Sequence, residues 1–304
     1  MQGLVVKSTG SFYEVRTAQG ILTCRVRGKL RLEGIKETNP IAVGDRVEVE
    51  QGSDYSSITE IHPRTNHILR QSVKKTGHAH VLAANVDQVM LLATLKQPRT
   101  SLGFIDRFFV SAESFRIPQV LVFNKMDLMN EDEKHQLEEL SRVYESIGVR
   151  VFQISSKEND GVDDLKTVFE NKITLVAGHS GVGKSTFLNA LLPGFELPVG
   201  AISGFSEKGT HTTTFAEMFA MDDNTYIIDT PGVKEWGLVE MEPEEISDYF
   251  PEMRVLRSDC KFGYRCLHLN EPKCAVKEAV SQQRIALSRY ESYVSMAEGE
   301  DNRK

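Results

Sequence analysis

The sequence predicts a chain of three parts, in which a small β-barrel precedes an α/β domain and a cysteine-rich segment with a terminal helix follows it. Short β-rich segments fill the first sixty residues, strands then alternate with helices around a glycine-rich loop, and three cysteines and a histidine gather near the end. A chain of this length has enough residues for a core in each part. The expected bounds are 1–69, 70–240 and 241–304.

The first part reads as short strands rich in β-branched and aromatic residues, separated by turns that contain glycine. Partial alternation of apolar and polar residues indicates strands with one buried face. Such strands suit a small five-stranded barrel, for which the OB-fold is the candidate architecture. The clearest strand segments are Leu4–Val6, Phe12–Arg16, Leu22–Val26 and Arg46–Val49.

From about residue 85, apolar strand segments alternate with helical segments. This pattern is typical of a mostly parallel sheet with helices on both faces and ligands at the carboxyl ends of its strands. Strands are expected at Val86–Leu95, Val120–Phe123, Val149–Ile154, Ile173–Ala177 and Tyr226–Ile228. Helices are expected at Gly103–Phe115, Glu131–Ile147, Val162–Phe169 and Lys184–Leu192.

Two further segments have simpler patterns. Leu192–Lys208 holds three glycines and two prolines without a clear period, so a mobile loop is expected there. Near the end, apolar residues recur at helical spacing, which indicates the packed face of a terminal helix. These residues are Val276, Val280, Leu287, Tyr290 and Val294.

Composition narrows the class of protein. Of 304 residues, 40% are hydrophobic and 26% charged, which are ordinary globular values. No signal-peptide pattern and no apolar run of membrane-spanning length are present, so a soluble cytoplasmic protein without a membrane partner is expected. The net charge of −7 divides into +4 over residues 1–75, −13 over 76–251 and +2 over 252–304. The basic flanks favour nucleic-acid contact only weakly, and ordinary solvated charge is the alternative.

Residues 178–185 read Gly-His-Ser-Gly-Val-Gly-Lys-Ser, which fits the phosphate-binding loop between a strand and a helix. Backbone amides of such a loop hold phosphate oxygens. Lys184 adds positive charge at the phosphates, and Ser185 offers its hydroxyl to Mg²⁺. The expected nucleotide-binding residues here are Gly178, His179, Ser180, Gly181, Val182, Gly183, Lys184, Ser185 and Thr186.

Two later segments supply the remaining magnesium and phosphate contacts. Asp229 ends a strand before the Thr-Pro-Gly sequence that closes at Gly232. An aspartate at this place holds Mg²⁺ through water, and the glycine amide senses the γ-phosphate. Thr213 is expected to bind Mg²⁺ and the γ-phosphate, with Thr212 and Thr214 as alternatives. Entry into a β-strand would also explain the threonine run.

The sequence Asn-Lys-Met-Asp at residues 124–127 follows a predicted strand and indicates guanine recognition. The Asp127 carboxylate can accept from both N1–H and the N2 amine of guanine, a donor pair that adenine lacks. The Lys125 stem would lie along the base. The segment 155–157, after the next strand, matches the loop whose backbone amide meets guanine O6. The expected base-site residues are Asn124, Lys125, Asp127, Ser155, Ser156 and Lys157.

These motifs run in a rotated order, because the base loop precedes the phosphate loop. The sequence therefore predicts a circularly permuted P-loop GTPase domain that uses GTP, GDP and Mg²⁺. Val233 occupies the place where Ras-like enzymes carry a water-orienting glutamine, and no arginine finger is evident, so intrinsic hydrolysis should be slow. The expected catalytic residues are His211, Lys184 and Thr213. His211→Ala should lose stimulated turnover but keep nucleotide affinity, unless His211 is only a solvated loop residue.

Cys260, Cys266, His268 and Cys274 together supply three thiolates and an imidazole. These four donors complete a closed tetrahedral site, so one structural Zn²⁺ is expected. Reduced buried cysteines are the alternative. Cys24 is isolated in the sequence and is expected in the barrel core.

With these motifs in place, the chain resembles the RsgA family of circularly permuted ribosome-assembly GTPases over nearly its whole length. The resemblance implies GTP hydrolysis stimulated by the small ribosomal subunit, rRNA contacts from the barrel and zinc segment, and a role in late subunit maturation. A monomer is expected. The family tends to carry arginine where this chain has Thr210, which casts doubt on an arginine contact there. In the linker between barrel and GTPase domain, four cations could contact RNA phosphates or could simply be solvated. They are Arg64, Arg70, Lys74 and Lys75.

Two other functions compete with this interpretation. A signalling GTPase whose barrel binds protein would share the same motifs, because fold does not settle function. A small-molecule kinase would turn over ATP as fast as GTP, which the guanine-reading loop disfavours. If the permutation couples the Asp229 loop to the zinc segment, stiffening residues 233–250 should uncouple subunit release from hydrolysis.

Overall fold

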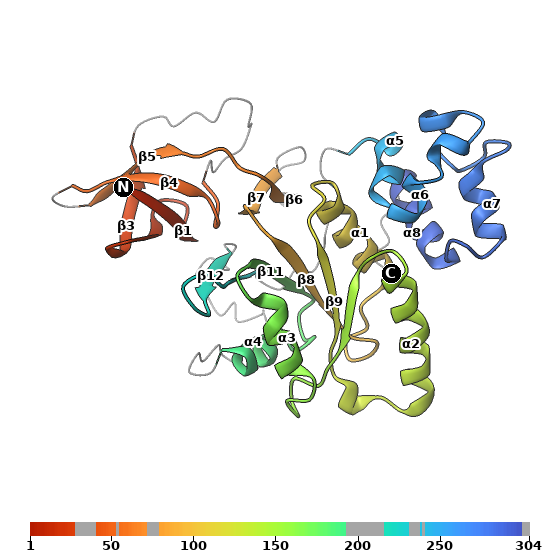
Figure 1. Cartoon of the computed structure of the whole chain (residues 1–304), viewed down its shortest axis with the longest axis horizontal. Helices are drawn as coiled ribbons and strands as arrows, with labels where there is room; N and C mark the ends of the chain where they lie inside the picture. Colours follow the sequence, from red (N-terminus) through yellow and green to blue (C-terminus); the bar gives the residue numbers. More distant parts are fainter. Residues whose placement is uncertain are drawn as a thin grey trace, which may run out of the picture.

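Five strands close on themselves at the amino-terminal end of the chain (Figure 1). The computed structural model describes residues 1–27, 41–52, 55–71, 79–192, 216–230, 238 and 241–299. The strands are β1 (Gln2–Ser8), β2 (Tyr13–Thr17), β3 (Gly20–Val26), β4 (Arg46–Glu50) and β5 (Ser56–Ile61). They pair in the order β1-β2-β3-β5-β4, and β4 pairs back onto β1. The predicted five-stranded barrel is confirmed, and Cys24 lies fully buried in its aliphatic core.

The central domain is built on five parallel strands in the order β10-β9-β8-β11-β13. Their bounds are β8 (Gln88–Ala93), β9 (Gln119–Phe123), β10 (Arg150–Gln153), β11 (Ile173–Gly178) and β13 (Tyr226–Asp229). Every residue of β8 and β11 is buried. Helices cover both faces of these strands, which explains why their sequences are almost continuously apolar.

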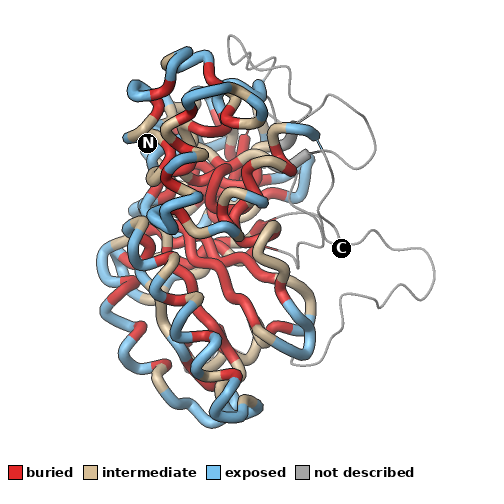
Figure 2. Tube along the Cα trace, turned by 90° about the vertical axis from the view of Figure 1, so that its right-hand side faces the viewer, coloured by how far each residue is buried: buried red, intermediate tan, exposed pale blue. Residues whose placement is uncertain are grey.

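Four helices form the two outer layers of this domain. They are α1 (Leu102–Glu113), α2 (Glu131–Glu145), α3 (Val162–Phe169) and α4 (Lys184–Leu191). Alternate strand residues face opposite layers: Leu91 packs with α1 and α2, whereas Leu92 packs with α3 and α4. Figure 2 shows the buried residues concentrated along the strands, with the exposed residues outside them.

The strand β12 (Glu217–Ala220) joins the central sheet to the barrel. It runs antiparallel to β13, and its residue Glu217 pairs with Lys7 of β1. The Lys7 ammonium donates to the Glu217 carboxylate over 2.7 Å, and this hydrogen bond is the main cause that raises the pKa of Lys7. This strand was not predicted, because four residues with a single buried side chain show no alternation.

A hairpin of β6 (His67–Gln71) and β7 (Ala79–Ala84) connects the barrel to the sheet. Gly44, just before β4, lies against this hairpin with φ +93°, and a Cβ there would stand 2.0 Å from the Ala84 carbonyl oxygen. Beside it, Asp45 accepts two hydrogen bonds from the Arg64 guanidinium, at 2.7 and 2.8 Å. A buried ion pair and a close backbone approach therefore define the junction.

The carboxyl-terminal domain is a set of short helices. These are α5 (Pro243–Ile246), η2 (Ser247–Tyr249), α6 (Pro251–Arg254), η3 (Arg257–Asp259), η4 (Gly263–Arg265), α7 (Ala275–Ser281) and α8 (Leu287–Ala297). The single terminal helix expected from the apolar spacing is two helices, because the chain turns between them with Gln283 at φ +59°. Leu287 begins the second helix and is 60% exposed, so it does not share the packed face.

No helix in the described ranges is long and apolar enough to cross a membrane. Beyond Leu192, the segment expected to be a mobile loop lies outside the described residues.

Candidate nucleotide site and metal cluster

The predicted nucleotide loops meet at one edge of the sheet. Parallel strands present their carboxyl ends together, so the loops that follow β9, β10 and β11 lie on the same side as the end of β13. The chain leaves β8 toward β9 and β10 on one side, while β11 and β13 lie on its other side. The phosphate loop, which follows β11, therefore lies at the topological switch point.

Asn124 connects three of these loops. Its amide nitrogen donates to the Val182 carbonyl over 2.8 Å, and its amide oxygen accepts from the Ser156 amide over 2.9 Å. The side chain is buried, and Gly183 approaches it so closely that a Cβ would stand 2.4 Å from its amide nitrogen. Asn124 therefore holds the base loops against the phosphate loop.

Asp127 is exposed, and its carboxylate accepts a hydrogen bond from the buried Ser155 hydroxyl over 2.6 Å. Lys125 adopts a left-handed backbone conformation, and its ammonium donates to the Gln97 carbonyl. Lys157 is exposed, and its ammonium lies 3.2 Å from the Glu158 carboxylate. The base-site residues expected from the sequence thus lie together.

Lys184 and Asp229 face each other across the neighbouring strands β11 and β13. The lysine ammonium lies 2.5 Å from the aspartate oxygen and also donates to the Thr230 carbonyl. Burial raises the pKa of Asp229, and the charge of Lys184 opposes that effect. The residues predicted to contact phosphate and Mg²⁺, Lys184 and Asp229, are therefore adjacent. Ser185 and Thr186 follow in the first turn of α4 and are partly exposed.

Two contacts at the phosphate loop were not predicted from the sequence. The His179 ring lies against the Phe104 ring of α1, with centroids 3.8 Å apart, and burial lowers the pKa of this histidine. A Cβ on Gly181 would stand 3.3 Å from the Cδ of Pro98. The segment between β8 and α1 therefore packs along the phosphate loop, and no local motif in the sequence predicts this contact.

Several predicted residues lie outside the described ranges. They are His211, Thr212, Thr213, Thr214 and Gly232. Among the considered linker cations, Arg64 is committed to the buried pair with Asp45, which does not fit a role as an exposed phosphate contact. Lys74 and Lys75 are not described.

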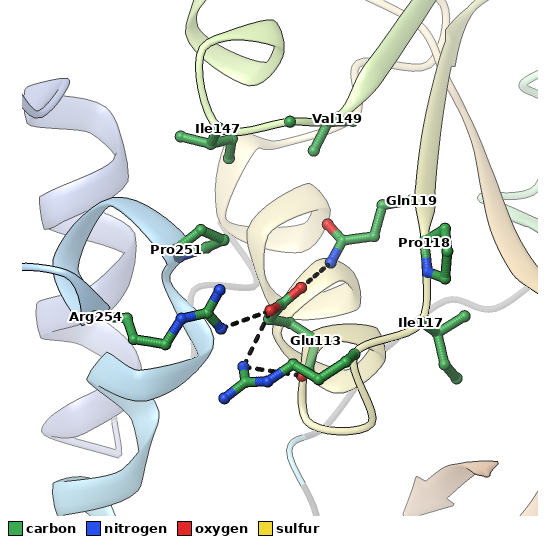
Figure 3. A pocket seen from close by; sticks show the side chains of 10 residues that line it. Glu113, Ile117, Pro118, Gln119, Ile147, Val149, Pro251 and Arg254 are labelled. Atoms are coloured by element: carbon green, nitrogen blue, oxygen red, sulfur yellow. Dashed lines mark hydrogen bonds and ion pairs between the residues drawn. The ribbon is translucent and has the colours of Figure 1, made fainter. Parts of the chain in front are cut away.

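A cavity of about 300 Å³ lies at the opposite edge of the sheet, between the starts of β9 and β10 and helix α6 (Figure 3). Glu113 at the end of α1 accepts hydrogen bonds there from Arg254, Arg116 and Gln119. This cavity is remote from the nucleotide loops and belongs to the contact between the central and carboxyl-terminal domains.

The four residues of the cysteine cluster converge in space. Their donor atoms all lie within 4.8 Å of one another, and all four residues are buried. His268 Nδ1 lies 3.3 Å from Cys274 Sγ and 3.6 Å from Cys260 Sγ, and these two sulfurs are 3.9 Å apart. Tetrahedral zinc with Zn–S near 2.3 Å and Zn–N near 2.0 Å would separate its donors by roughly 3.5–3.8 Å. The cluster therefore fits such an ion.

The electrostatics of the cluster agree with this fit. Burial, with a smaller contribution from Arg257, lowers the pKa of His268 to about 4, so its ring is neutral and able to act as a ligand. Burial, together with the neighbouring Cys274, raises the pKa of Cys266 to about 12. A divalent cation would supply the charge that lets these thiols ionise.

Fold and site together define a class of protein: a circularly permuted P-loop GTPase with an amino-terminal barrel and a carboxyl-terminal Cys₃His module. A family model described as RsgA GTPase matches residues 61–239, and one described as RsgA N-terminal domain matches residues 2–58. The chain belongs to the RsgA family of GTPases, and it is a GTP-hydrolysing enzyme that uses GTP, GDP and Mg²⁺.

Relatives match the chain over its full length. It is 51% identical to "Small ribosomal subunit biogenesis GTPase RsgA 2" of Bacteroides thetaiotaomicron, with 100% of this chain and 98% of that one covered. A relative from Flavobacterium psychrophilum is 48% identical, with 99% of this chain and 94% of that one covered. The crystal structure of YjeQ from Thermotoga maritima has a TM-score of 0.78 at 37% identity, covering 98% of this chain and 97% of that one. The crystal structure of YloQ, described as a circularly permuted GTPase, has a TM-score of 0.74 at 30% identity, covering 100% of this chain and 96% of that one.

Proposed function

We propose that this chain is a GTPase of small ribosomal subunit maturation, that it binds the subunit through rRNA, and that subunit binding stimulates hydrolysis. The observation that carries the proposal is the guanine-type site at the carboxyl edge of a permuted sheet, with a barrel on one side and a Cys₃His module on the other. The names of the full-length relatives, which describe small-subunit biogenesis, support it. The protein acts as a monomer in the cytoplasm.

In this proposal the residues of the site have distinct roles. Lys184 and the loop amides bind the phosphates, Ser185 and Asp229 hold Mg²⁺ directly and through water, and Asp127 reads guanine. Thr213 and Gly232 close on the γ-phosphate, and His211 positions the attacking water. When bound, Mg²⁺ neutralises the charge that develops on the phosphates. Cys260, Cys266, His268 and Cys274 hold one structural Zn²⁺.

Two exposed surfaces combine aromatic rings with cations, which suits stacking on unpaired RNA bases. On the barrel, the Arg25 guanidinium lies 4.4 Å from the Phe12 ring centroid and 5.0 Å from that of Tyr55, which is 50% exposed. Between two cysteine ligands, Lys261 lies over the exposed Phe262 ring, and the nearby Tyr264 is 66% exposed. The barrel and the carboxyl-terminal domain, which carry these residues, lie on opposite sides of the nucleotide domain (Figure 1).

Turnover of GTP with purified small subunits tests the proposed function. The expected result is stimulation by small subunits but not by large subunits, with an effect that declines as salt rises because phosphate contacts release counterions. Stimulation by a ribosome-free protein extract, with none from small subunits, would instead identify a signalling GTPase.

The RNA surfaces are tested by comparing variants in the same assay. Tyr55→Ala and Tyr264→Ala should each weaken binding to small subunits by about 1–3 kcal/mol, the range found for a lost base-stacking ring. Ile21→Ala is the matched control, because Ile21 is an exposed aliphatic residue on the same barrel and has no ring to stack on a base. Equal losses from all three variants would count against base stacking.

A further inference from the structure

Helix α1 contacts the phosphate loop at one end and the carboxyl-terminal domain along one side. In its first turn, Phe104 packs on His179 with ring centroids 3.8 Å apart. Two residues further on, Asp106 accepts a hydrogen bond from Arg289 of α8 over 2.5 Å. The helix ends at Glu113, which accepts from Arg254 of α6 over 2.7 Å (Figure 3).

The spacing of these residues explains how one helix makes both contacts. Asp106, Val110 and Glu113 follow at i, i+4 and i+7, which places them on one stripe of a helix. Val110 packs in the apolar core of the carboxyl-terminal domain. Phe104 and Phe108 belong instead to the core beneath the parallel sheet. Helix α1 therefore packs against the central sheet on one side and the carboxyl-terminal domain on the other.

The Asp106–Arg289 pair is buried, with both side chains almost fully shielded from solvent. The same Asp106 oxygen accepts from the Tyr144 hydroxyl of α2 over 2.8 Å, and the Arg289 guanidinium also donates to Glu252 over 2.8 Å. The guanidinium carbon lies 4.5 Å from the Phe250 ring centroid. Because both charged groups are buried, loss of Arg289 would leave Asp106 with only the Tyr144 hydroxyl, and loss of Asp106 would leave Arg289 with only Glu252, so the pair holds α8 and α1 in one relative position.

The segment that leads into α1 touches the phosphate loop as well. Thr94 and Thr100 close this segment through mutual backbone and hydroxyl hydrogen bonds at 2.9 and 3.1 Å. Between them, Pro98 lies against Gly181, while Ser101 caps the helix by accepting from the Phe104 amide over 3.3 Å. A displacement of α1 would therefore reach the phosphate loop at two positions, His179 and Gly181.

We propose that Phe104 and the Asp106–Arg289 pair are positioning residues of the GTPase, through which the placement of the carboxyl-terminal domain sets the geometry of the phosphate loop. A ligand that shifts α8 changes nucleotide affinity, and by linkage the nucleotide changes the affinity for that ligand by the same factor. This coupling passes through α1. It rests on the GTPase site alone and not on the identity of the partner.

The test measures the dissociation constants of fluorescent GDP and GTP analogues, with single-turnover hydrolysis, on full-length variants without ribosomes. Phe104→Leu and the charge-neutral double variant Asp106→Asn/Arg289→Gln should each weaken nucleotide binding at least fivefold, the lower end of typical coupling. Combining all three changes should weaken nucleotide binding by less than the product of the separate fold-changes, because the residues act along one path.

Arg254→Gln is the matched control. It removes an ion pair between the same domains at the far end of α1, and Glu113 keeps its bonds to Arg116 and Gln119. Nucleotide affinity should change less than twofold, even where the melting temperature falls. The proposal is overturned if Arg254→Gln weakens binding as much as the other variants, which would indicate general loosening. It is equally overturned if folded Phe104→Leu binds nucleotide within twofold of the unaltered protein.

Discussion

Single side chains organise the nucleotide site before any ligand contributes. Asn124 uses its amide to hold two other loops, so its role is to place the site, whereas Asp127 keeps an exposed carboxylate. Neighbouring serines differ in the same way. The Ser155 hydroxyl donates to Asp127, but the buried Ser156 hydroxyl has no hydrogen-bond partner among the described residues.

This contrast predicts different effects of two similar substitutions. Ser155→Ala removes a hydrogen bond to a charged group, about 1.5 kcal/mol or more, and should weaken GDP binding about tenfold. Ser156→Ala removes a hydroxyl without a described partner and should leave binding within twofold. Isothermal titration of both variants with GDP is the measurement. Equal affinities for the two variants would contradict the role given to Ser155.

Asp229 combines a functional role with a cost to folding. Because burial raises its pKa above the unfolded value of 3.8, ionising it costs folding free energy as the pH rises past that value, and the cost is complete once the pH exceeds the raised pKa. Asp229→Asn removes this cost, so the nucleotide-free melting temperature at pH 7 should not fall. Mg²⁺-dependent turnover should drop roughly 10–100-fold, as for loss of an outer-shell metal contact. A large drop in melting temperature would contradict the first expectation.

At the scale of elements, the joint between barrel and central sheet includes a close backbone approach at Gly44. Gly44 donates its amide to the Val5 carbonyl and accepts from the Asn85 side chain, both over 2.9 Å, so barrel and sheet are hydrogen-bonded through one residue. No larger residue fits, because the Ala84 carbonyl occupies the place of a Cβ.

Gly44→Ala should therefore destabilise the protein by about 3 kcal/mol or more, combining a left-handed backbone penalty of about 1–2 kcal/mol with a steric overlap. Gly20→Ala is the control, since Gly20 also has a positive φ, +109°, but open space around its Cβ position. It should cost only the backbone penalty. Denaturant unfolding of both variants measures the difference in the free energy of unfolding. Equal losses in the two variants would show that the backbone around Gly44 can shift to accept a Cβ.

Sequence patterns predicted the elements whose signals are local. The loops at residues 124–127 and 178–185 follow apolar strands, and both were placed correctly for that reason. The short β12 and the break between α7 and α8 were missed, since four residues or one left-handed Gln283 leave little trace in a periodic pattern. Contacts such as Asn124 with Val182 and Asp106 with Arg289 join residues 58 and 183 positions apart, and only the fold brings them together.

At the scale of the whole molecule, the carboxyl-terminal domain has a core of a different kind. Its apolar cluster includes Cys260, Cys266 and Cys274 beside Phe250 and Tyr293, and its described helices are short. Short helices are marginal alone, so a metal at the cluster would supply much of the folding energy.

Elemental analysis of the purified protein should thus find one zinc per chain, and Cys274→Ser should lose it. A strong chelator should make residues 241–299 sensitive to protease. The control is Cys24→Ser, which alters the cysteine in the barrel core and should keep the full zinc content. Unchanged protease resistance after complete zinc removal would show that the domain folds without metal.

The strand order also governs how the chain can fold during synthesis. β8 lies between β9 and β11, but β11 follows β9 and β10 in the sequence, so the first half of the sheet emerges with β8 as an open edge. After Gln88 that edge is apolar, and every residue of β8 is buried in the finished protein. Exposed apolar edges invite aggregation. The nascent chain must therefore shelter β8 until the strand that precedes the phosphate loop has been translated.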